Sequence, residues 1–198
     1  MVDNAVMEPD SITVYRLLVA HAAAAFAIHG GFILARPGWS RRLVEGSEGV
    51  SFYLIIGGIA AFYASLFLCL ISPESVAAFS WPFSWWLFIP GCALLALQLL
   101  FMFAAHLSLG RSWSGSVFTY DGQELVTTGI YAHVSHPIYA GVVFWAAGAL
   151  LTGHNALFLT LVPAAVGVVI RIRAEERHLQ DRFGDAWTRH RKKTRTFL

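Results

Sequence analysis

Residues 125–179 decide the fold of this chain, and they read LVTTGIYAHVSHPIYAG (125–141), VVFWAAGALLTGHNALFLTLVPAAVGVVI (142–170) and RIRAEERHL (171–179). Two apolar stretches, 137–152 and 156–170, are separated by the polar turn at 153–155. Each stretch is shorter than the roughly 20 residues that a helix needs to cross a bilayer core. The sequence therefore predicts a helical hairpin in the membrane that returns the chain to the side it left.

Polar side chains lie at the open end of this hairpin. His136 and Tyr139 begin the first arm, and Arg171 and Glu175 follow the second. Because an ionisable residue near lipid costs about 2.5–3.5 kcal/mol on insertion scales, such residues are candidates for a functional site. Arg171 and Glu175 form an (i, i+4) pair, which is ordinary on a solvated helix. The same face continues into the membrane through Gly167, which favours a cavity over a bulky anchor.

The composition is that of an integral membrane protein. Hydrophobic residues make up 57% of the 198 positions and charged residues only 13%, whereas soluble domains average about 25% charged residues. Three further apolar runs are long enough to cross a bilayer: 12–35, 49–71 and 84–107. The sequence predicts an all-α integral membrane protein of about five transmembrane segments. We expect a single domain, 1–198, with three spans in residues 1–107 and the catalytic region in residues 108–198.

The positive charges predict the orientation. Of the 14 Lys and Arg residues, 13 fall on the side that holds the ends of the first and third spans and the C-terminus. The positive-inside rule makes that side cytoplasmic. We therefore expect the N-terminus outside, and the C-terminus and the open end of the hairpin inside. The basic tail follows a membrane segment and contains aromatic residues, which favours an anionic lipid surface over nucleic acid as its neighbour.

Several histidines and both cysteines lie within the apolar runs. His21, His29 and His106 could form a metal or proton path, but no carboxylate accompanies them and an (i, i+8) spacing is loose for metal ligands. We interpret them as structural. Cys69 and Cys92 also lie in apolar runs, where thiols behave as small hydrophobes. The sequence predicts no metal site and no disulfide.

The pair His136-Pro137 predicts where the first arm begins, because proline is favoured in the first turn of a helix. The positive end of that helix suits a carboxylate or another anion. Tyr131 and Tyr139 flank the pair. They are either anchors at the membrane interface or walls for an adenine ring or a sulfonium cation, and the tyrosines alone do not decide.

The second half of the chain resembles the isoprenylcysteine carboxyl methyltransferase family of membrane methyltransferases, which also includes relatives of phospholipid N-methyltransferases. The resemblance runs from about residue 107 to residue 198. It rests on four blocks in the family's order, which are LGRSWSG, ELVTTGIYAHVSHPIYAG, RIRAEERHL and FGDAWTRHRKKTRTFL. Four blocks in order are far more specific than any one of them. The first two spans match the family only in being apolar.

The resemblance implies S-adenosylmethionine as the methyl donor, bound at the cytoplasmic face and covered by a C-terminal helical segment. It implies a lipophilic acceptor that arrives sideways from the bilayer. Arg171 corresponds to the substrate-binding residue and, with Glu175, to the catalytic residues. The cofactor-binding positions correspond to Gln123, Glu124, Leu125, Val126, Tyr131, His136, Pro137, Ile138, Tyr139 and Glu175.

Four positions depart from the family's pattern. Ser135 stands where the family usually has arginine, and His190 where it usually has tyrosine. Thr196 takes a position that is often basic, and Gln123 one that is often histidine. The loss of the arginine beside His136 removes a positive charge from the predicted donor pocket.

We therefore predict an S-adenosylmethionine-dependent carboxyl O-methyltransferase of the isoprenylcysteine type, acting among membrane lipids on a lipophilic small molecule or a prenylated substrate. Alternatives within methyl transfer are a phospholipid amine and a thiol as acceptors. Alternatives of other classes are an NADPH-dependent membrane reductase and a non-catalytic membrane scaffold. The spacing between TTGIY and HPIY favours methyl transfer.

Overall fold

The computed structural model describes residues 9–34, 49–110 and 124–197, and this part of the chain is helical. It contains isolated β-bridges but no strand in those residues, so the predicted all-α class is confirmed. The elements are α1 Ser11–Leu34, α2 Val50–Ile71, α3 Pro73–Val76, η1 Ala77–Phe79, α4 Trp85–Leu109, η3 Gly129–Ala132, α5 Pro137–Gly153, η4 Ala156–Leu161, α6 Val162–Phe183 and α7 Asp185–Lys193.

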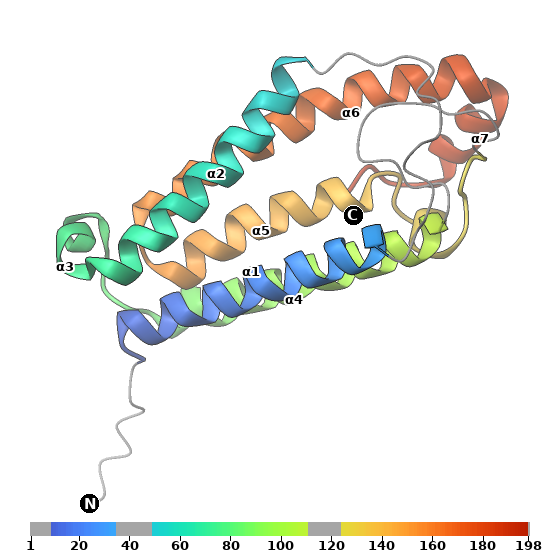
Figure 1. Ribbon diagram of the computed structural model, residues 1–198. Coiled ribbons are helices and arrows are strands. Elements are labelled where there is room, and N and C mark those ends of the chain that lie inside the picture. The colour runs from blue at the N-terminus through green and yellow to red at the C-terminus, as the bar shows by residue number, and fades with distance from the viewer. Residues whose placement is uncertain (1–8, 35–48, 111–123, 198) are drawn as a thin grey trace, which may run out of the picture.

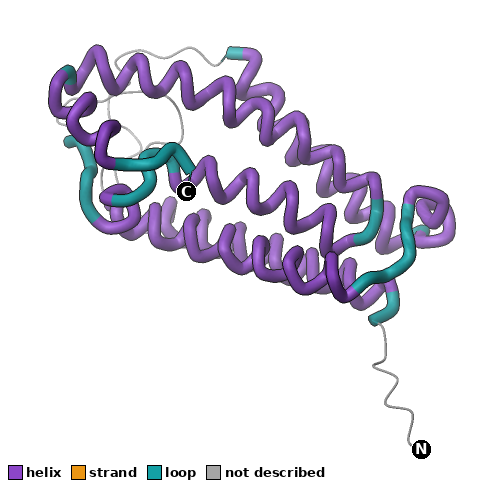
Figure 2. Tube along the Cα trace, turned by 180° about the vertical axis from the view of Figure 1, so that it is seen from behind, coloured by secondary structure: helices purple, strands orange, loops and turns teal. Residues whose placement is uncertain are grey.

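Five long helices run roughly side by side, with α5 between the pair α1 and α4 and the pair α2 and α6 (Figure 1). The view from behind shows the same arrangement (Figure 2). The segment before α5, the last turns of α6 and all of α7 gather at one end of the bundle, which we call the site end. The turn between α5 and η4 lies at the opposite end, with α3.

Four helical stretches are long and apolar enough to cross a membrane: Ser11–Phe32, Val50–Ile71, Trp85–Leu109 and Ala156–Phe183. Helices of this length and composition are typical of an integral membrane protein, as the sequence predicts. Helix α5 is apolar but shorter, with 17 residues. The predicted turn at 153–155 is confirmed by His154, whose backbone is left-handed (φ 48°).

The helix of the second hairpin arm extends beyond its apolar stretch. That stretch ends at Ile170, and the (i, i+4) pairing of Arg171 and Glu175 predicts a helix that continues past it. Helix α6 contains both residues and ends at Phe183. An apolar stretch ends at the first charged residue, whereas a helix ends only where its backbone hydrogen bonds end. This helix ends at Gly184, whose φ is 49°. Arg171 and Glu175 therefore belong to the same continuous helix as the apolar segment.

Close glycine contacts fix α5 and α6 against their neighbours. A Cβ atom added to Gly91 of α4 would lie 2.7 Å from the backbone nitrogen of Thr152 in α5, and one added to Gly58 of α2 would lie 2.7 Å from that of Ala164 in α6. Only glycine permits this approach of the backbones. The two helices that carry the site are therefore each held by a glycine contact.

Candidate active site

The C-terminal tail binds the segment that precedes α5. The Ser135 N–H donates to the Arg195 carbonyl over 2.8 Å, and the Arg195 N–H donates to the His133 carbonyl over 3.0 Å. The hydroxyls of Ser135 and Thr194 are also hydrogen-bonded. Ser135, for which the resemblance implies an arginine, thus ties the tail to the start of α5.

A cavity of about 440 Å³ runs from the site end into the membrane region. That volume falls within the range of about 300–1,000 Å³ typical of ligand sites. Its part at the site end, the polar part, is lined by Glu124, Leu125, Val126, Tyr131, Ser135, His136, Glu175, Leu179, Phe183, Trp187 and His190. Its apolar part is lined by Ala25, Phe26, His29, Phe52, Ile55, Ile56, Ile59, Tyr63, Gln98, Met102, Val142, Trp145 and Val168.

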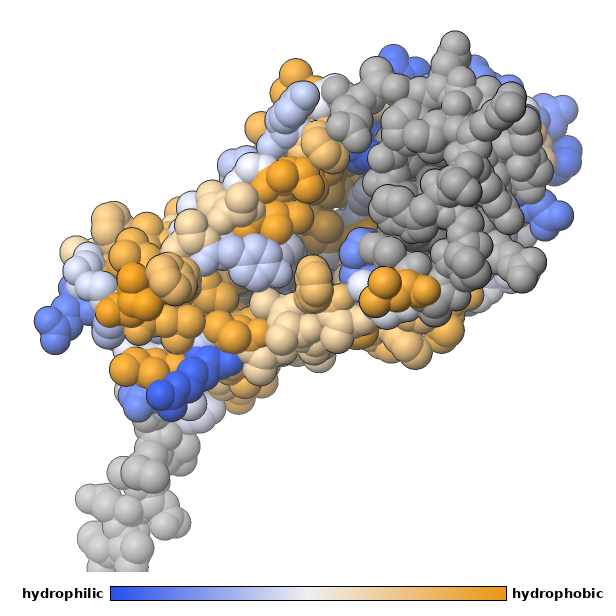
Figure 3. All heavy atoms as spheres, in the orientation of Figure 1, coloured by the Kyte–Doolittle hydropathy of each residue, from blue (hydrophilic) through white to orange (hydrophobic). Residues whose placement is uncertain are grey.

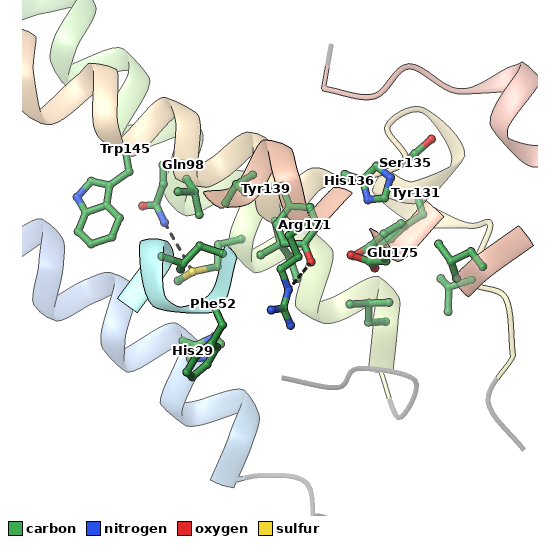
Figure 4. A pocket seen from close by; sticks show the side chains of 18 of the residues that line it. His29, Phe52, Gln98, Tyr131, Ser135, His136, Tyr139, Trp145, Arg171 and Glu175 are labelled. Atoms are coloured by element: carbon green, nitrogen blue, oxygen red, sulfur yellow. Dashed lines mark hydrogen bonds between the residues drawn. The ribbon is translucent and has the colours of Figure 1, made fainter. Parts of the chain in front are cut away.

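Most of the site residues predicted from the sequence line this one cavity (Figure 4). Ile138, Tyr139 and Arg171 also line it, where the two parts join. Pro137 is buried behind it as the first residue of α5. Gln123 lies outside the described residues. The structure therefore brings residues from the segment before α5 and from α6 together, across some 40 positions of sequence.

Arg171 is the central charged group of the cavity. It is buried, and its Nε donates a hydrogen bond to the Tyr139 hydroxyl over 3.2 Å. The Glu175 carboxylate lies on the other side of that hydroxyl (Figure 4). The Oε2 atom of Glu175 is buried and has no hydrogen-bond partner among the described residues. A buried carboxylate oxygen without a partner is costly, so the site is suited to a ligand that donates to it.

Aromatic rings form one wall of the polar part. The His136 and Tyr139 rings stack with centroids 5.7 Å apart and an interplanar angle of 18°. The Trp187 ring stands edge-on to His136 at 6.2 Å and contacts His190 at 5.7 Å. Burial and the Glu175 charge raise the pKa of Tyr131 far above its ordinary value, so its phenol stays neutral. Flat rings of this kind suit an adenine ring or a sulfonium cation.

Sequence reasoning did not assign Trp187 and His190 to the site. Both are on α7 and both are buried. On a nine-residue helix they are three positions apart, which places them on one face, and the other positions from 185 to 193 are mostly charged or polar. That amphipathic pattern was the available signal that α7 packs one face against the rest of the protein.

Acidic pH is expected to loosen α7. Burial, together with the nearby His136 and Arg191, lowers the pKa of His190 from its ordinary 6.5. The undocked helix binds this proton more readily than the docked one, so docking is fully stable above about pH 6.5 and weakens below it. Hydrogen exchange of residues 185–197, corrected for the intrinsic rate, should show more opening at about pH 5.5 than at about pH 7.5.

The matched variant for that experiment is His190→Asn, which keeps a polar side chain but cannot titrate. Its exchange should change little between the two pH values. An equal acid response in the parent chain and in the variant would assign the effect to another group.

The apolar part of the cavity reaches an exposed hydrophobic surface. Three lining residues, Phe26, Ile56 and Tyr63, are 76%, 51% and 41% exposed. They lie on α1 and α2, where the surface is mostly hydrophobic and is hollowed between the two helices (Figure 3). The cavity is therefore open on this hydrophobic surface.

The histidines of α1 and α4 make contacts next to the apolar part of the cavity. His106 Nδ1 contacts the Met102 carbonyl oxygen at 2.7 Å, and its Nε2 contacts His29 Nδ1 at 3.1 Å. His21 is buried, with its Nε2 3.3 Å from the Leu95 carbonyl oxygen. His21 thus joins α1 to α4, as a structural residue would. His29 also lines the cavity, which the sequence interpretation did not foresee.

The sequence is similar to known proteins over its second half and beyond. The profile of the phospholipid methyltransferase family matches residues 86–186, about half of the chain. The protein-S-isoprenylcysteine O-methyltransferase of Schizosaccharomyces pombe is 35% identical over 94 residues, which are 46% of this chain and 40% of that protein. The uncharacterized protein YpbQ of Bacillus subtilis is 33% identical over 125 residues, which are 62% of this chain and 73% of YpbQ. The similarity to the S. pombe enzyme thus spans less than half of its length.

The fold is also similar to a solved structure, that of the eukaryotic intramembrane Ras methyltransferase, isoprenylcysteine carboxyl methyltransferase. The superposition has a TM-score of 0.56 at 18% sequence identity and covers 98% of this chain and 68% of the other. At this identity it shows a shared fold. The family predicted from the four sequence blocks is confirmed: the chain belongs to the phospholipid methyltransferase family of membrane proteins, together with the isoprenylcysteine methyltransferases.

Proposed function

We propose that this protein is an S-adenosylmethionine-dependent membrane methyltransferase that methylates the carboxylate of a lipophilic acceptor. The observation that carries the proposal is the place of Arg171. It lies where the polar part of the cavity, suited to the donor, meets the apolar part, which is open to lipid. A carboxylate held there has its apolar chain in the membrane and its oxygen facing the donor side.

The polar part fits the chemical groups of S-adenosylmethionine. Glu175 has a buried oxygen without a described partner, which suits a ribose hydroxyl or the ammonium group. The stacked rings of His136 and Tyr139 suit the adenine or the sulfonium. The positive end of α5 at Pro137 suits the carboxylate. The bound donor supplies an electrophilic methyl group, and these residues orient it.

Arg171 suits the acceptor. Its Nε is engaged with Tyr139, so the two terminal nitrogens of the guanidinium group are directed to the cavity and can bind a carboxylate through two hydrogen bonds. A carboxylate is already ionised at neutral pH, so no general base is required. Positioning and the exclusion of water then provide most of the rate enhancement.

Replacing Arg171 by alanine should lower methyl transfer to prenylcysteine-like carboxylates by about tenfold to a hundredfold, because a charged hydrogen-bonding partner contributes about 1.5–3 kcal/mol. The measurement is transfer of labelled methyl from S-adenosylmethionine to a panel of carboxylate, phospholipid-amine and thiol acceptors. The matched control is Arg173→Ala, which removes an exposed arginine from the same helix. Carboxylate methylation that survives in the Arg171 variant would contradict the assignment.

A phospholipid amine or a thiol is the second candidate acceptor, and the His29–His106 pair favours it. Such acceptors lose a proton around methyl transfer, and a histidine ring at the cavity wall can accept one. Hydrogen bonding to a second histidine, itself held by the Met102 carbonyl, would stabilise that protonated ring. Methylation of amines or thiols that does not depend on Arg171 and is lost in His29→Ala would support this candidate over the carboxylate.

We further propose that the site end faces the cytoplasm. Of the 14 Lys and Arg residues, 13 belong to this end or to the connections that lead to it, and soluble S-adenosylmethionine is available on that side. The proposal is tested by the accessibility of single cysteines to a membrane-impermeant thiol reagent in right-side-out and inverted vesicles. Arg189→Cys on α7 should react only in inverted vesicles. The two free cysteines at positions 69 and 92 are replaced by alanine beforehand.

A further inference from the structure

The two adjacent acids of α6 face different neighbours. Glu175 lines the cavity, whereas Glu176 is not among its lining residues. Glu176 instead accepts two hydrogen bonds on one oxygen: Arg191 Nε donates to Oε1 over 2.7 Å, and His136 Nε2 lies 3.4 Å from the same atom. The acids therefore have separate surroundings, and Glu176 belongs with α7 rather than with the cavity.

Arg191 extends this contact to the C-terminal tail. Its two terminal nitrogens donate to the Thr196 hydroxyl over 2.5 Å and to the Thr194 carbonyl over 3.4 Å. The tail itself pairs with the backbone of Ser135 and His136. One carboxylate oxygen thus connects α6, α7, the tail and the start of α5.

The helix held in this way covers the polar part of the cavity. Trp187 and His190 of α7 line that part, and both are buried. A molecule bound between these rings and the rings of α5 cannot leave past α7 while the helix is docked. The contact of Glu176 with Arg191 is therefore placed to control the opening of the polar part.

We propose that Glu176 is a positioning residue that, through Arg191, holds α7 closed over the methyl donor and so sets how long the donor stays bound. This inference rests on the proposed function for the identity of the donor. The side chains of Glu176 and Arg191 are 30% and 35% exposed. Solvent screens the pair in part, which suits a contact that opens in each catalytic cycle.

The test is a double-mutant cycle on the full chain in lipid nanodiscs, with Glu176→Gln, Arg191→Gln and both together. Glu176→Gln keeps one oxygen that can accept from His136, removes the charge and replaces the second oxygen by an NH2 group. Matched controls are Asp181→Asn on α6 and Arg189→Gln on α7, both exposed. Two quantities are measured: the dissociation rate of S-adenosylmethionine and the hydrogen exchange of residues 185–197.

Each single substitution should speed donor dissociation by about tenfold and raise exchange of residues 185–197 to a similar extent. The donor should dissociate from the double variant less than about threefold faster than from either single variant, because both substitutions remove the same contact. In the single variants, the rate of donor dissociation should change far more than the rate of methyl transfer from already bound donor in a single turnover. The controls should behave as the parent chain does.

Three results would overturn the inference or a step of it. Effects that multiply in the double variant would show that Glu176 and Arg191 act independently. Faster donor dissociation in Glu176→Gln without faster exchange of residues 185–197 would show that Glu176 contacts the donor itself. If the parent chain binds no S-adenosylmethionine, the proposed function fails. The exchange measurements alone then still test whether Glu176 holds α7, and an unchanged exchange in the single variants would refute that step.

Discussion

Replacing Glu175 by glutamine should weaken binding of S-adenosylmethionine by about a hundredfold or more. The Oε2 atom of Glu175 is buried and has no described protein partner, and we propose that the methyl donor supplies that partner. Loss of the charge removes at least one charged hydrogen bond, worth about 1.5–3 kcal/mol, from an environment shielded from water. The amide of glutamine would also place donor hydrogens where the ligand presents donors of its own. Equilibrium binding of labelled donor to the purified protein measures the effect.

Three comparisons make this prediction specific. Asp181→Asn removes an exposed acid from the same helix and should leave donor affinity within about twofold of the parent value. Glu175→Asp keeps the charge but shortens the side chain, so its affinity should lie between those of the parent chain and Glu175→Gln. Unchanged thermal stability in Glu175→Gln would exclude unfolding as the cause. Donor affinity that survives the loss of this charge would remove Glu175 from the donor site.

Part of this architecture could be predicted because local signals agree with the fold. Pro137 fixes the start of α5 in sequence and in structure, since proline lacks the N–H that a first turn leaves unpaired. The turn at 153–155 predicts that the second arm of the hairpin runs back toward the end where the first arm begins. His136 and Arg171 must then lie at the same end, although they are 35 positions apart.

The arrangement of the C-terminal tail could not be predicted in the same way. Its hydrogen bonds run from Arg195 and Thr196 to residues some 60 positions earlier, and no periodic pattern in sequence specifies such a pairing. The resemblance to the family implied that a C-terminal helical segment covers the site. It did not show which residues hold that segment in place. Nor did spacing within one helix show that His29 meets His106, because that contact depends on how α1 packs against α4.

Tight packing between α4 and α5 far from the site is expected to be as important for function as the site residues. These two helices share the most extensive contact in the described structure, and Gly91 lies within it. A Cβ atom at Gly91 would overlap the Thr152 hydroxyl oxygen and would be 2.7 Å from the Thr152 backbone nitrogen. Real Cβ atoms do not approach so closely. The hydroxyl could rotate away, but the backbone nitrogen moves only with α5 itself.

Gly91→Val should therefore displace α5 and lower the midpoint of thermal unfolding by about 5–10 °C, since overpacking costs about 1–3 kcal/mol. Donor affinity should fall as well, because Tyr139 belongs to this helix and His136 directly precedes it. The matched control is Gly57→Val, since a Cβ atom there meets nothing within 4 Å. Adding Thr152→Ala to Gly91→Val should restore only part of the stability, because it removes the hydroxyl but leaves the backbone nitrogen in place. Full rescue by Thr152→Ala would show that the side chain alone sets the spacing of the two helices, and that the backbone contact does not fix the position of α5.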